Sequence, residues 1–386
     1  MNLTQIQANI GHMQDNSAPI SGARLSVDLA ALGANYGEVV RRSSPAAVAP
    51  VVKADAYGLG MAPIAQKLAV MGAESFFVAR MEEGIALRPI VPNTRIFVFH
   101  GLTPGTASSY VAHGLIPVLN TAEEIAEYSA HARGSRNILD AAIQIDTGMN
   151  RSGLSSEDVS ALAANPASAL EGLNLVLIMS HLACADEPAH ALNRKQLERF
   201  RASLEALPPT PASLAATAGI ELGKEFLFEI VRPGIGLYGG DPITARSEAD
   251  GSNPYSTVAT LTANVLHTRH IEEGETVGYG ATFRAAKPSV VAVVPLGYAD
   301  GLIRAMGAAG HAAINGIRVP FAGRISMDLV ALEITALDED KCKSGTEVEF
   351  LGRTISLKEV AQAAGTIGHE VLTSLSPRVA RVYAEG

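Results

Sequence analysis

The chain from about residue 47 to residue 240 repeats one pattern of apolar and polar positions. A short run rich in β-branched and aromatic residues ends in a polar side chain, and an Ala-, Leu- and Glu-rich amphipathic segment follows it. Parallel strands that are covered on both faces are nearly continuous apolar runs. Eight such runs predict a (β/α)8 TIM-type barrel rather than an open sheet. They are VAPVVK (48–53), SFFVAR (75–80), RIFVFH (95–100), LIPVLN (115–120), AIQID (142–146), NLVLIMSH (174–181), SLAATAG (213–219) and EIVRPGIGLYG (229–239).

The pattern changes after Pro242. Residues 243–255 are polar and rich in turn formers, which indicates a linker. Beyond it, short alternating runs such as SVVAVVPLG and EVEFLG are separated by Gly, Pro and Asp, which is typical of a mainly antiparallel β domain. We therefore expect three parts: an N-terminal extension (1–22), a barrel domain (23–250) and a C-terminal β domain (251–386). The segment 23–29 is expected to be a strand that joins the C-terminal domain.

The composition narrows the class of protein. The chain has 386 residues, of which 47% are hydrophobic and 18% charged, as in globular proteins with more than one core. A net charge of −9 argues against a nucleic-acid partner, which requires a basic face. The apolar runs are too short to cross a membrane, and the N-terminus lacks the apolar segment of a signal peptide. Cys184 and Cys342 show no paired spacing, so we expect no disulfide, no metal site and a cytoplasmic location.

The carboxyl ends of the strands form the catalytic face of such a barrel. Those ends carry Lys53, Arg80, His100, Asn120, Asp146, His181, Thr217 and Arg232. Polar residues also mark where strands leave a core, and Arg80, His100 and Asn120 are interpreted in that way. Lys53 ends a wholly apolar strand, where lost hydration would lower its pKa and make its amine a nucleophile. A solvated lysine at a strand end is the alternative.

The segment around Lys53 is similar to a motif of a known enzyme family. VVKADAYGLG (51–60) resembles the motif by which alanine racemases attach pyridoxal 5′-phosphate. The resemblance continues in the family's order from about residue 23 to the C-terminus. It implies a barrel followed by a β domain, pyridoxal phosphate as cofactor, and interconversion of L- and D-alanine that supplies D-alanine for peptidoglycan. The further motifs are DTGMNRSG (146–153), SHLACADEP (180–188), RPGIGLYG (232–239), VGYGATFRA (277–285), LGYADG (296–301), GRISMD (323–328) and SPRVAR (376–381).

The resemblance also implies two catalytic bases. Lys53 would hold the cofactor covalently and serve as one base, and Tyr279 would be the other. By its local pattern alone, Tyr279 is a tyrosine in a glycine-flanked turn. A phenol has a pKa near about 10, so it needs cationic neighbours to act as a base. His181 and Arg232 match the family residues that link this tyrosine to the cofactor ring, and Arg232 would contact the pyridine nitrogen.

Further residues would bind the cofactor and the substrate by the same resemblance. Tyr57, Thr217, Gly234 and Ile235 match the phosphate contacts. Substrate contacts would come from Arg151, Met327, Asp328 and Tyr298, with Arg324 at the entrance. For Tyr298, Arg324 and Asp328, a solvated polar loop is the competing interpretation. In the family the tyrosine base comes from the partner subunit, so a head-to-tail homodimer is implied.

Three positions depart from the family pattern. Gln144 replaces a lysine that is often carbamylated, so we predict no carbamylation beside Arg151. Pro377 replaces a phosphate-contacting tyrosine, and Ala216 replaces an asparagine. Three rival functions are a serine or broad-specificity racemase, an enzyme resembling D-threonine aldolase or a decarboxylase, and a barrel that only carries the cofactor. Tyr279 and the lack of a metal-ligand cluster near the C-terminus argue against the second, and the C-terminal β domain argues against the third. Replacing a methyl by a hydroxymethyl side chain changes the free energy of binding in a pocket by only about 1–3 kcal/mol. The sequence therefore does not rank alanine against serine as the substrate.

Overall fold

Eight parallel strands form a closed barrel in the N-terminal part of the protein. The computed structural model describes residues 22–243, 246, 252–338 and 341–385. Strands β3 to β8 form one parallel sheet, and β2 pairs with β9. Parallel bridges between Val51 and Phe77 and between Ala216 and Arg232 join these two sheets into a ring. The strands are β2 (Ala47–Val48), β3 (Ser75–Val78), β4 (Arg95–Val98), β5 (Ile116–Leu119), β6 (Leu139–Gln144), β7 (Leu173–Met179), β8 (Ala212–Ser213) and β9 (Ile230–Val231). The predicted barrel is confirmed.

The last two strands are much shorter than the apolar runs that predict them. In the run 213–219 the strand ends at Ser213, and helix α11 (Thr217–Glu221) begins within the same run. In the run 229–239 the strand ends at Val231, and a 3-10 helix, η2 (Ile235–Tyr238), follows. The hydroxyl of Thr217 accepts hydrogen bonds from the backbone amides of Gly234 and Gly236. The backbone of both runs therefore leaves the strand ladder to form a binding loop.

Amphipathic helices cover the outside of the barrel. Helix α7 begins after Thr121, whose side chain accepts a hydrogen bond from the Glu124 amide, and α10 buries Leu197 and Phe200. Helix α2 begins after Asp28, whose carboxylate accepts from the Ala31 amide. The helices are α2 (Leu29–Ser43), α4 (Met61–Val70), α5 (Met81–Leu87), α6 (Ala107–His113), α7 (Ala122–Ser135), α8 (Ser156–Ala164), α9 (Pro166–Ala169) and α10 (Ala191–Ala206).

The C-terminal domain is built on two larger sheets. One sheet has the order β16-β15-β18-β10-β1-β19, and the other has the order β11-β14-β17. Strand β1 (Arg24–Asp28) lies in the first sheet, antiparallel to β10 and parallel to β19. The remaining strands are β10 (Ala259–Asn264), β11 (His267–Ile271), β12 (Thr276–Val277), β13 (Phe283–Arg284), β14 (Ser289–Val294), β15 (His311–Ile314), β16 (Ile317–Pro320), β17 (Val330–Glu333), β18 (Glu347–Leu351) and β19 (Ala380–Ala384).

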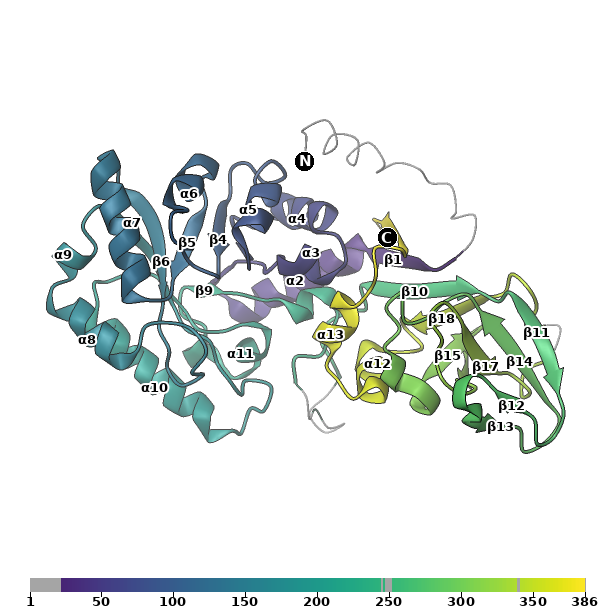
Figure 1. Ribbon diagram of the computed structural model, residues 1–386. Helices are drawn as coiled ribbons and strands as arrows, with labels where there is room; N and C mark the ends of the chain where they lie inside the picture. The colour runs from purple at the N-terminus through teal and green to yellow at the C-terminus, as the bar shows by residue number, and fades with distance from the viewer. Residues whose placement is uncertain (1–21, 244–245, 247–251, 339–340, 386) are drawn as a thin grey trace.

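Two helices that the sequence pattern did not predict connect this domain to the barrel. They are α12 (Leu357–Ala364) and α13 (Gly368–Thr373). Ser356 and Glu359 form a reciprocal capping box at the start of α12. Helix α13 packs on the turn that follows Lys53: a Cβ atom on Gly58 would lie only 2.6 Å from the carbonyl oxygen of Leu372. Figure 1 shows α12 and α13 where the two domains meet.

Candidate active site

Lys53 opens a short turn with unusual backbone geometry. In α3 (Lys53–Tyr57), residues 54–57 all have positive φ angles, from 51 to 58°. Non-glycine residues rarely adopt this left-handed conformation, because the Cβ atom crowds the backbone. Two carboxylates hold the turn: Glu83 accepts from the Ala54 amide and Asp55 from the Met61 amide, each at 2.7 Å. Strained backbone of this kind is concentrated at functional sites.

The Lys53 side chain is half-buried at the mouth of the barrel. Its Nζ atom is 5.6 Å from the centre of the Phe99 ring. Burial lowers the pKa of Lys53, the positive charge of Arg151 lowers it further, and Glu83 opposes the shift. Because less free energy is needed to deprotonate it, this amine is a better nucleophile than a solvated lysine.

The buried Arg232 and the half-buried His181 form a pair at the same end of the barrel. Arg232 is 2% exposed, and its Nη2 atom donates to the carbonyl oxygen of Ser180 at 2.6 Å. Burial lowers the pKa of Arg232 to about 9, which leaves it charged at neutral pH. Nη2 also lies 3.5 Å from Nδ1 of His181. Burial, followed by the charges of Arg232, Arg151 and Lys53, lowers the pKa of His181 to about 3. His181 is therefore neutral at pH 7, and Arg232 carries the positive charge of the pair.

A cradle of backbone amides and hydroxyl groups lies next to the turn. The buried Thr217 hydroxyl accepts from the amides of Gly234 at 2.9 Å and Gly236 at 3.4 Å. A Cβ atom on residue 234 would lie 2.2 Å from the Tyr57 hydroxyl oxygen, so only glycine fits there. The Tyr57 ring packs on Tyr238, with 4.6 Å between the ring centres.

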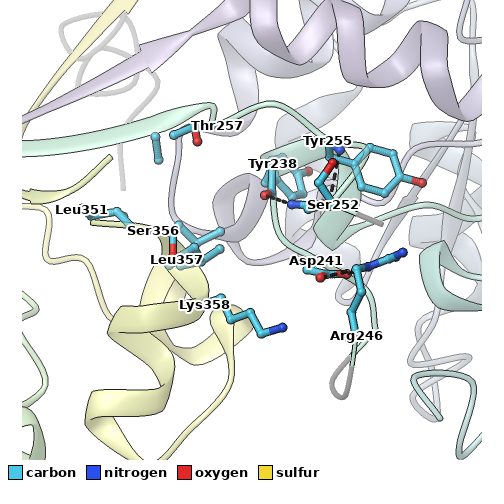
Figure 2. A pocket seen from close by; sticks show the side chains of 14 residues that line it. Tyr238, Asp241, Arg246, Ser252, Tyr255, Thr257, Leu351, Ser356, Leu357 and Lys358 are labelled. Carbon is cyan, nitrogen blue, oxygen red and sulfur yellow. Dashed lines mark hydrogen bonds and ion pairs between the residues drawn. The ribbon is translucent and has the colours of Figure 1, made fainter. Parts of the chain in front are cut away.

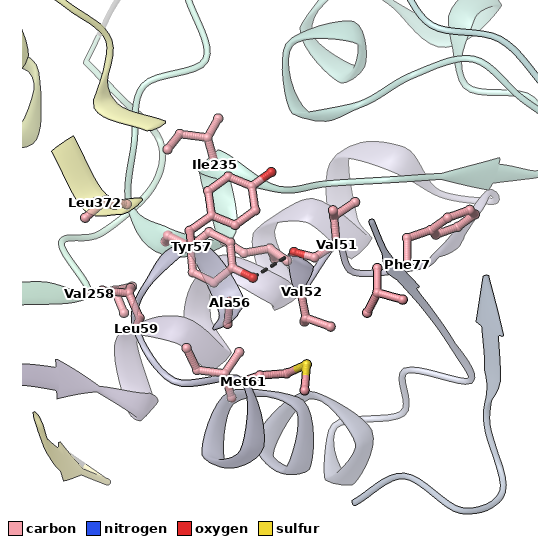
Figure 3. Packing of buried hydrophobic residues seen from close by; sticks show 14 of the residues in the cluster. Val51, Val52, Ala56, Tyr57, Leu59, Met61, Phe77, Ile235, Val258 and Leu372 are labelled. Carbon is pink, nitrogen blue, oxygen red and sulfur yellow. Dashed lines mark hydrogen bonds between the residues drawn. The ribbon is translucent and has the colours of Figure 1, made fainter. Parts of the chain in front are cut away.

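Figure 3 shows Tyr57 and Ile235 close together above the turn. Amides and hydroxyl groups that converge at a close approach of the backbone suit a phosphate group. These residues therefore fit the phosphate end of pyridoxal phosphate, and Lys53 begins the turn that carries Tyr57.

Gln144 supports the segment that carries Arg151. Gln144 is 8% exposed, and its Nε2 atom donates to the carbonyl oxygen of Ser152 at 2.9 Å. The Ser152 hydroxyl donates in turn to the side-chain oxygen of Asn120 at 2.7 Å. Arg151 is exposed, but its charge reaches both Lys53 and His181. The neutral amide of Gln144 therefore holds the backbone next to Arg151, whose charge acts on Lys53 and His181.

The second expected base lies on a different face. Tyr279 is 70% exposed in a 3-10 turn, η4 (Tyr279–Ala281), between β12 and β13. Met327 and Tyr298 are also exposed, at 53% and 41%. Close approaches join these loops: a Cβ atom on Gly280 would lie 2.9 Å from the Arg324 guanidinium, and one on Gly297 would lie 2.2 Å from the Met327 carbonyl oxygen. Figure 1 places β12 and β13 at the end of the C-terminal domain that is farther from α3.

One chain thus assembles only part of the expected residue set. The barrel mouth brings together Lys53, Tyr57, Arg151, His181, Thr217, Arg232, Gly234 and Ile235. The C-terminal domain presents Tyr279, Tyr298, Met327 and Asp328 on its surface, with Asp328 paired to Arg378 at 3.0 Å. Sequence reasoning missed His369 of α13, whose ring lies 5.8 Å from that of Tyr57. No strand-end position or quoted motif pointed to it.

A separate cavity lies between the barrel and the C-terminal domain. It has a volume of about 560 Å³ and is lined by Tyr238, Asp241, Lys358 and neighbouring residues. Figure 2 shows the Asp241–Arg246 ion pair facing Leu357 and Lys358 across it. Lys53 and His181 do not line this cavity, so it is distinct from the candidate active site.

Comparisons with known proteins cover nearly the whole chain. Residues 27–242 match the profile described as "Alanine racemase, N-terminal domain", and residues 258–383 match "Alanine racemase, C-terminal domain". The chain is 43% identical to "Alanine racemase, catabolic" of Agrobacterium fabrum, covering 95% of this chain and 93% of the relative. It is 41% identical to an alanine racemase of Rhizobium meliloti, covering 97% and 100%.

Solved structures agree with this similarity. An alanine racemase from Bartonella henselae with covalently bound pyridoxal phosphate superposes with a TM-score of 0.89 at 36% identity, covering 95% of this chain and 100% of the other. A biosynthetic alanine racemase from Pseudomonas aeruginosa gives a TM-score of 0.87 at 34% identity, with the same coverage.

Proposed function

Because this chain belongs to the alanine racemase family, we propose that it interconverts L- and D-alanine with pyridoxal phosphate as cofactor. The observation that carries the proposal is the placement of the Lys53 amine beside the cradle of Thr217 and Gly234, in a chain that matches both family domains. The named relatives include a catabolic and a biosynthetic racemase. Both names give the same reaction, but one enzyme is catabolic and the other biosynthetic. Supply of D-alanine for peptidoglycan is therefore one of two proposed roles, and breakdown of alanine is the other.

The barrel mouth supplies the binding half of the mechanism. When bound, the cofactor would make the Cα proton of an amino acid acidic by withdrawing electrons from that carbon. Thr217, Tyr57 and the amides of Gly234 and Ile235 would hold its phosphate. Arg232 has only N–H donors, so at the ring nitrogen it would donate a hydrogen bond without readily releasing a proton. Arg151 would hold the substrate carboxylate.

Racemisation requires a proton to leave one face of Cα and another to return on the opposite face. Lys53 holds or releases a proton at Nζ on one face, helped by its lowered pKa. We assign the opposite face to the hydroxyl of Tyr279. The charged Arg232 would stabilise phenolate there through the neutral His181, which accepts from Arg232 and can donate from its other ring nitrogen.

We infer that a head-to-tail homodimer completes the site. Tyr279 is exposed, and its turn lies away from α3 within one chain. Exposed apolar side chains beside it, Met327 (53%) and Leu329 (40%), are suited to burial against another subunit. Reciprocal pairing of the barrel mouth with this face would bring Tyr279 of the partner subunit toward Lys53. It would form two composite sites.

Subunit mixing tests the composite site. Lys53→Ala and Tyr279→Phe are each expected to be inactive. If each site uses Lys53 of one chain and Tyr279 of the other, a mixed dimer keeps one intact site of two. With random exchange, half of the dimers are mixed, so about a quarter of the wild-type activity should return. Both variants should sediment as dimers in analytical ultracentrifugation. Absence of recovery after demonstrated subunit exchange would contradict the shared site.

Two rivals are separated by isotope exchange. Protein incubated with L-alanine or L-serine in deuterated water is expected to racemise alanine and to incorporate deuterium at Cα. Faster exchange of serine would favour a serine or broad-specificity racemase, and no exchange with either would favour a cofactor carrier. A cytoplasmic location is proposed from the two cysteines, Cys184 and Cys342, which are both unpaired. In the part of the chain that the structure describes, no helix is long and apolar enough to span a membrane.

A further inference from the structure

His369 places a side chain from the C-terminal domain against Tyr57, one of the residues that fit a phosphate group. Its ring centre lies 5.8 Å from that of Tyr57, with the two planes at 41°. Tyr57 also packs on Tyr238 of the barrel at 4.6 Å. The phenol that borders Gly234 is therefore held by aromatic contacts from both domains. Nothing in the motif analysis assigned a role to His369.

The helix that carries His369 is fixed to the lysine turn. The carbonyl oxygen of Leu372 lies so close to Gly58 that no Cβ atom would fit between them. Arg381 donates to the Gly58 carbonyl at 3.0 Å and also to the carbonyls of Leu375, Ser376 and Val379. These contacts join α13, the chain that follows it and the residue after Tyr57. His369 therefore has a defined position relative to Tyr57.

The charges around His369 link it to the residues near Lys53. Its side chain is exposed to solvent on one side and borders protein on the other. Burial lowers the pKa of His369, the charge of Lys53 lowers it further, and Asp186 opposes the shift. On its own helix, the carboxylate of Glu370 is bonded to the Thr366 hydroxyl. Among the described residues, Lys53 and Asp186 act on the charge of the imidazole and Tyr57 contacts its ring, whereas Arg381 donates to carbonyl oxygens.

We propose that His369 is a positioning residue for the phosphate of the cofactor, acting through the Tyr57 ring and through a positive charge that it acquires when the phosphate binds. The inference rests on the proposed cofactor. A phosphate monoester carries about −1.5 to −2 charges at pH 7, which more than offsets the single positive charge of Lys53. A dianion in the cradle of Thr217 and Gly234 would therefore favour protonated His369. By linkage, protonation of His369 tightens phosphate binding to the same extent.

The proposal is tested by binding rather than by turnover. The probe is pyridoxine 5′-phosphate, which has no aldehyde and cannot bond to Lys53. Calorimetric titration of cofactor-free protein in two buffers of different ionisation enthalpy measures proton uptake on binding. At pH 6.5 the wild type should take up more protons than His369→Phe, which keeps a ring against Tyr57. The variant should bind about two- to fivefold more weakly, as expected for loss of one partly solvated charge interaction.

A second variant separates charge from packing. At pH 8.5, where the imidazole is neutral, His369→Phe should bind like the wild type, whereas His369→Ala should still bind more weakly because Tyr57 loses its neighbour. His113→Phe, a substitution at the exposed end of α6, serves as the matched control and should change neither affinity nor proton uptake.

Equal proton uptake and equal affinity of wild type and His369→Phe at pH 6.5 would overturn the proposal. That result would leave Cα exchange with alanine intact. A failure of the racemase assignment would instead abolish exchange while the binding difference remained measurable.

Discussion

The barrel mouth and the exposed face of the C-terminal domain carry equally important expected residues, but the two regions are built differently. Arg232 is 2% exposed and bonded on several sides, whereas Tyr279 is 70% exposed on a short turn. In the barrel mouth, burial lowers the pKa values of Lys53, His181 and Arg232 before any ligand binds. The barrel mouth is thus organised within a single chain. The exposed face would acquire a comparable environment only through the burial that the proposed dimer provides.

The largest effect should come from the exposed face. Tyr279→Phe removes one hydroxyl group from a solvated turn, so the fold and cofactor binding should be unchanged. Racemisation should fall by about 10³-fold, within the usual range for loss of a general base. The measurement is the rate of D-alanine formation from L-alanine. Ile317→Thr, at an exposed position on β16 of the same domain, is the control. If Tyr279→Phe retained more than a tenth of the wild-type rate, the two-base assignment would be wrong.

The next effect tests the preformed cradle. Gly234→Ala would place a Cβ atom 2.2 Å from the Tyr57 hydroxyl oxygen, so the cradle must open. Cofactor affinity, measured by absorbance titration of the cofactor-free protein, should weaken by at least about tenfold, as expected when one charge-assisted hydrogen bond is lost. Gly37→Ala in α2, where a Cβ atom meets nothing within 4 Å, should leave affinity unchanged. It should also stabilise the fold by up to about 1 kcal/mol. Unchanged affinity in Gly234→Ala would show that the cradle does not hold the phosphate.

A smaller effect should appear in the dependence of stability on pH. The unfolded chain takes up a proton on His181 near pH 6.5, whereas the folded chain takes it up near pH 3. The contribution of neutral His181 to the free energy of unfolding is therefore fully present above pH 6.5 and is lost as the pH falls toward 3. The free energy of unfolding should fall by at most about 1.4 kcal/mol per pH unit in this range. Urea midpoints of the cofactor-free protein between these pH values give this slope. His181→Asn should flatten the slope, and equal slopes for both proteins would contradict a neutral buried imidazole.

The smallest effect should come from the support of Arg151. Gln144→Leu frees the Ser152 carbonyl and loosens the neighbouring arginine. The KM for alanine should rise by about threefold while kcat changes little, because ground-state and transition-state binding are weakened alike. Asn174→Ala, which also removes an amide hydrogen bond from the barrel wall, should leave both constants unchanged. A fall in kcat without a change in KM would place Gln144 in the chemical step instead.

The outcome of the sequence analysis differed between the two domains for a physical reason. In the barrel, each buried strand is a continuous apolar run, so the number and order of strands could be predicted from hydrophobicity. In the C-terminal domain, the alternating apolar and polar residues predicted only strands, so the helices α12 and α13 were not predicted. The capping box of Ser356 and Glu359 was the available signal for α12. Because α13 was missed, His369 was missed with it.

The parallel barrel and the residues at its strand ends could be predicted from the sequence alone. Both follow from local periodicity and from motifs such as those around Lys53 and Arg232. The left-handed turn of residues 54–57, the neutral state of His181 and the contact of His369 with Tyr57 became visible only in the folded chain. It also decided that Tyr279 lies away from the lysine turn within one chain. These properties depend on packing between distant segments, which sets burial, charge and distance and leaves no local pattern in the sequence.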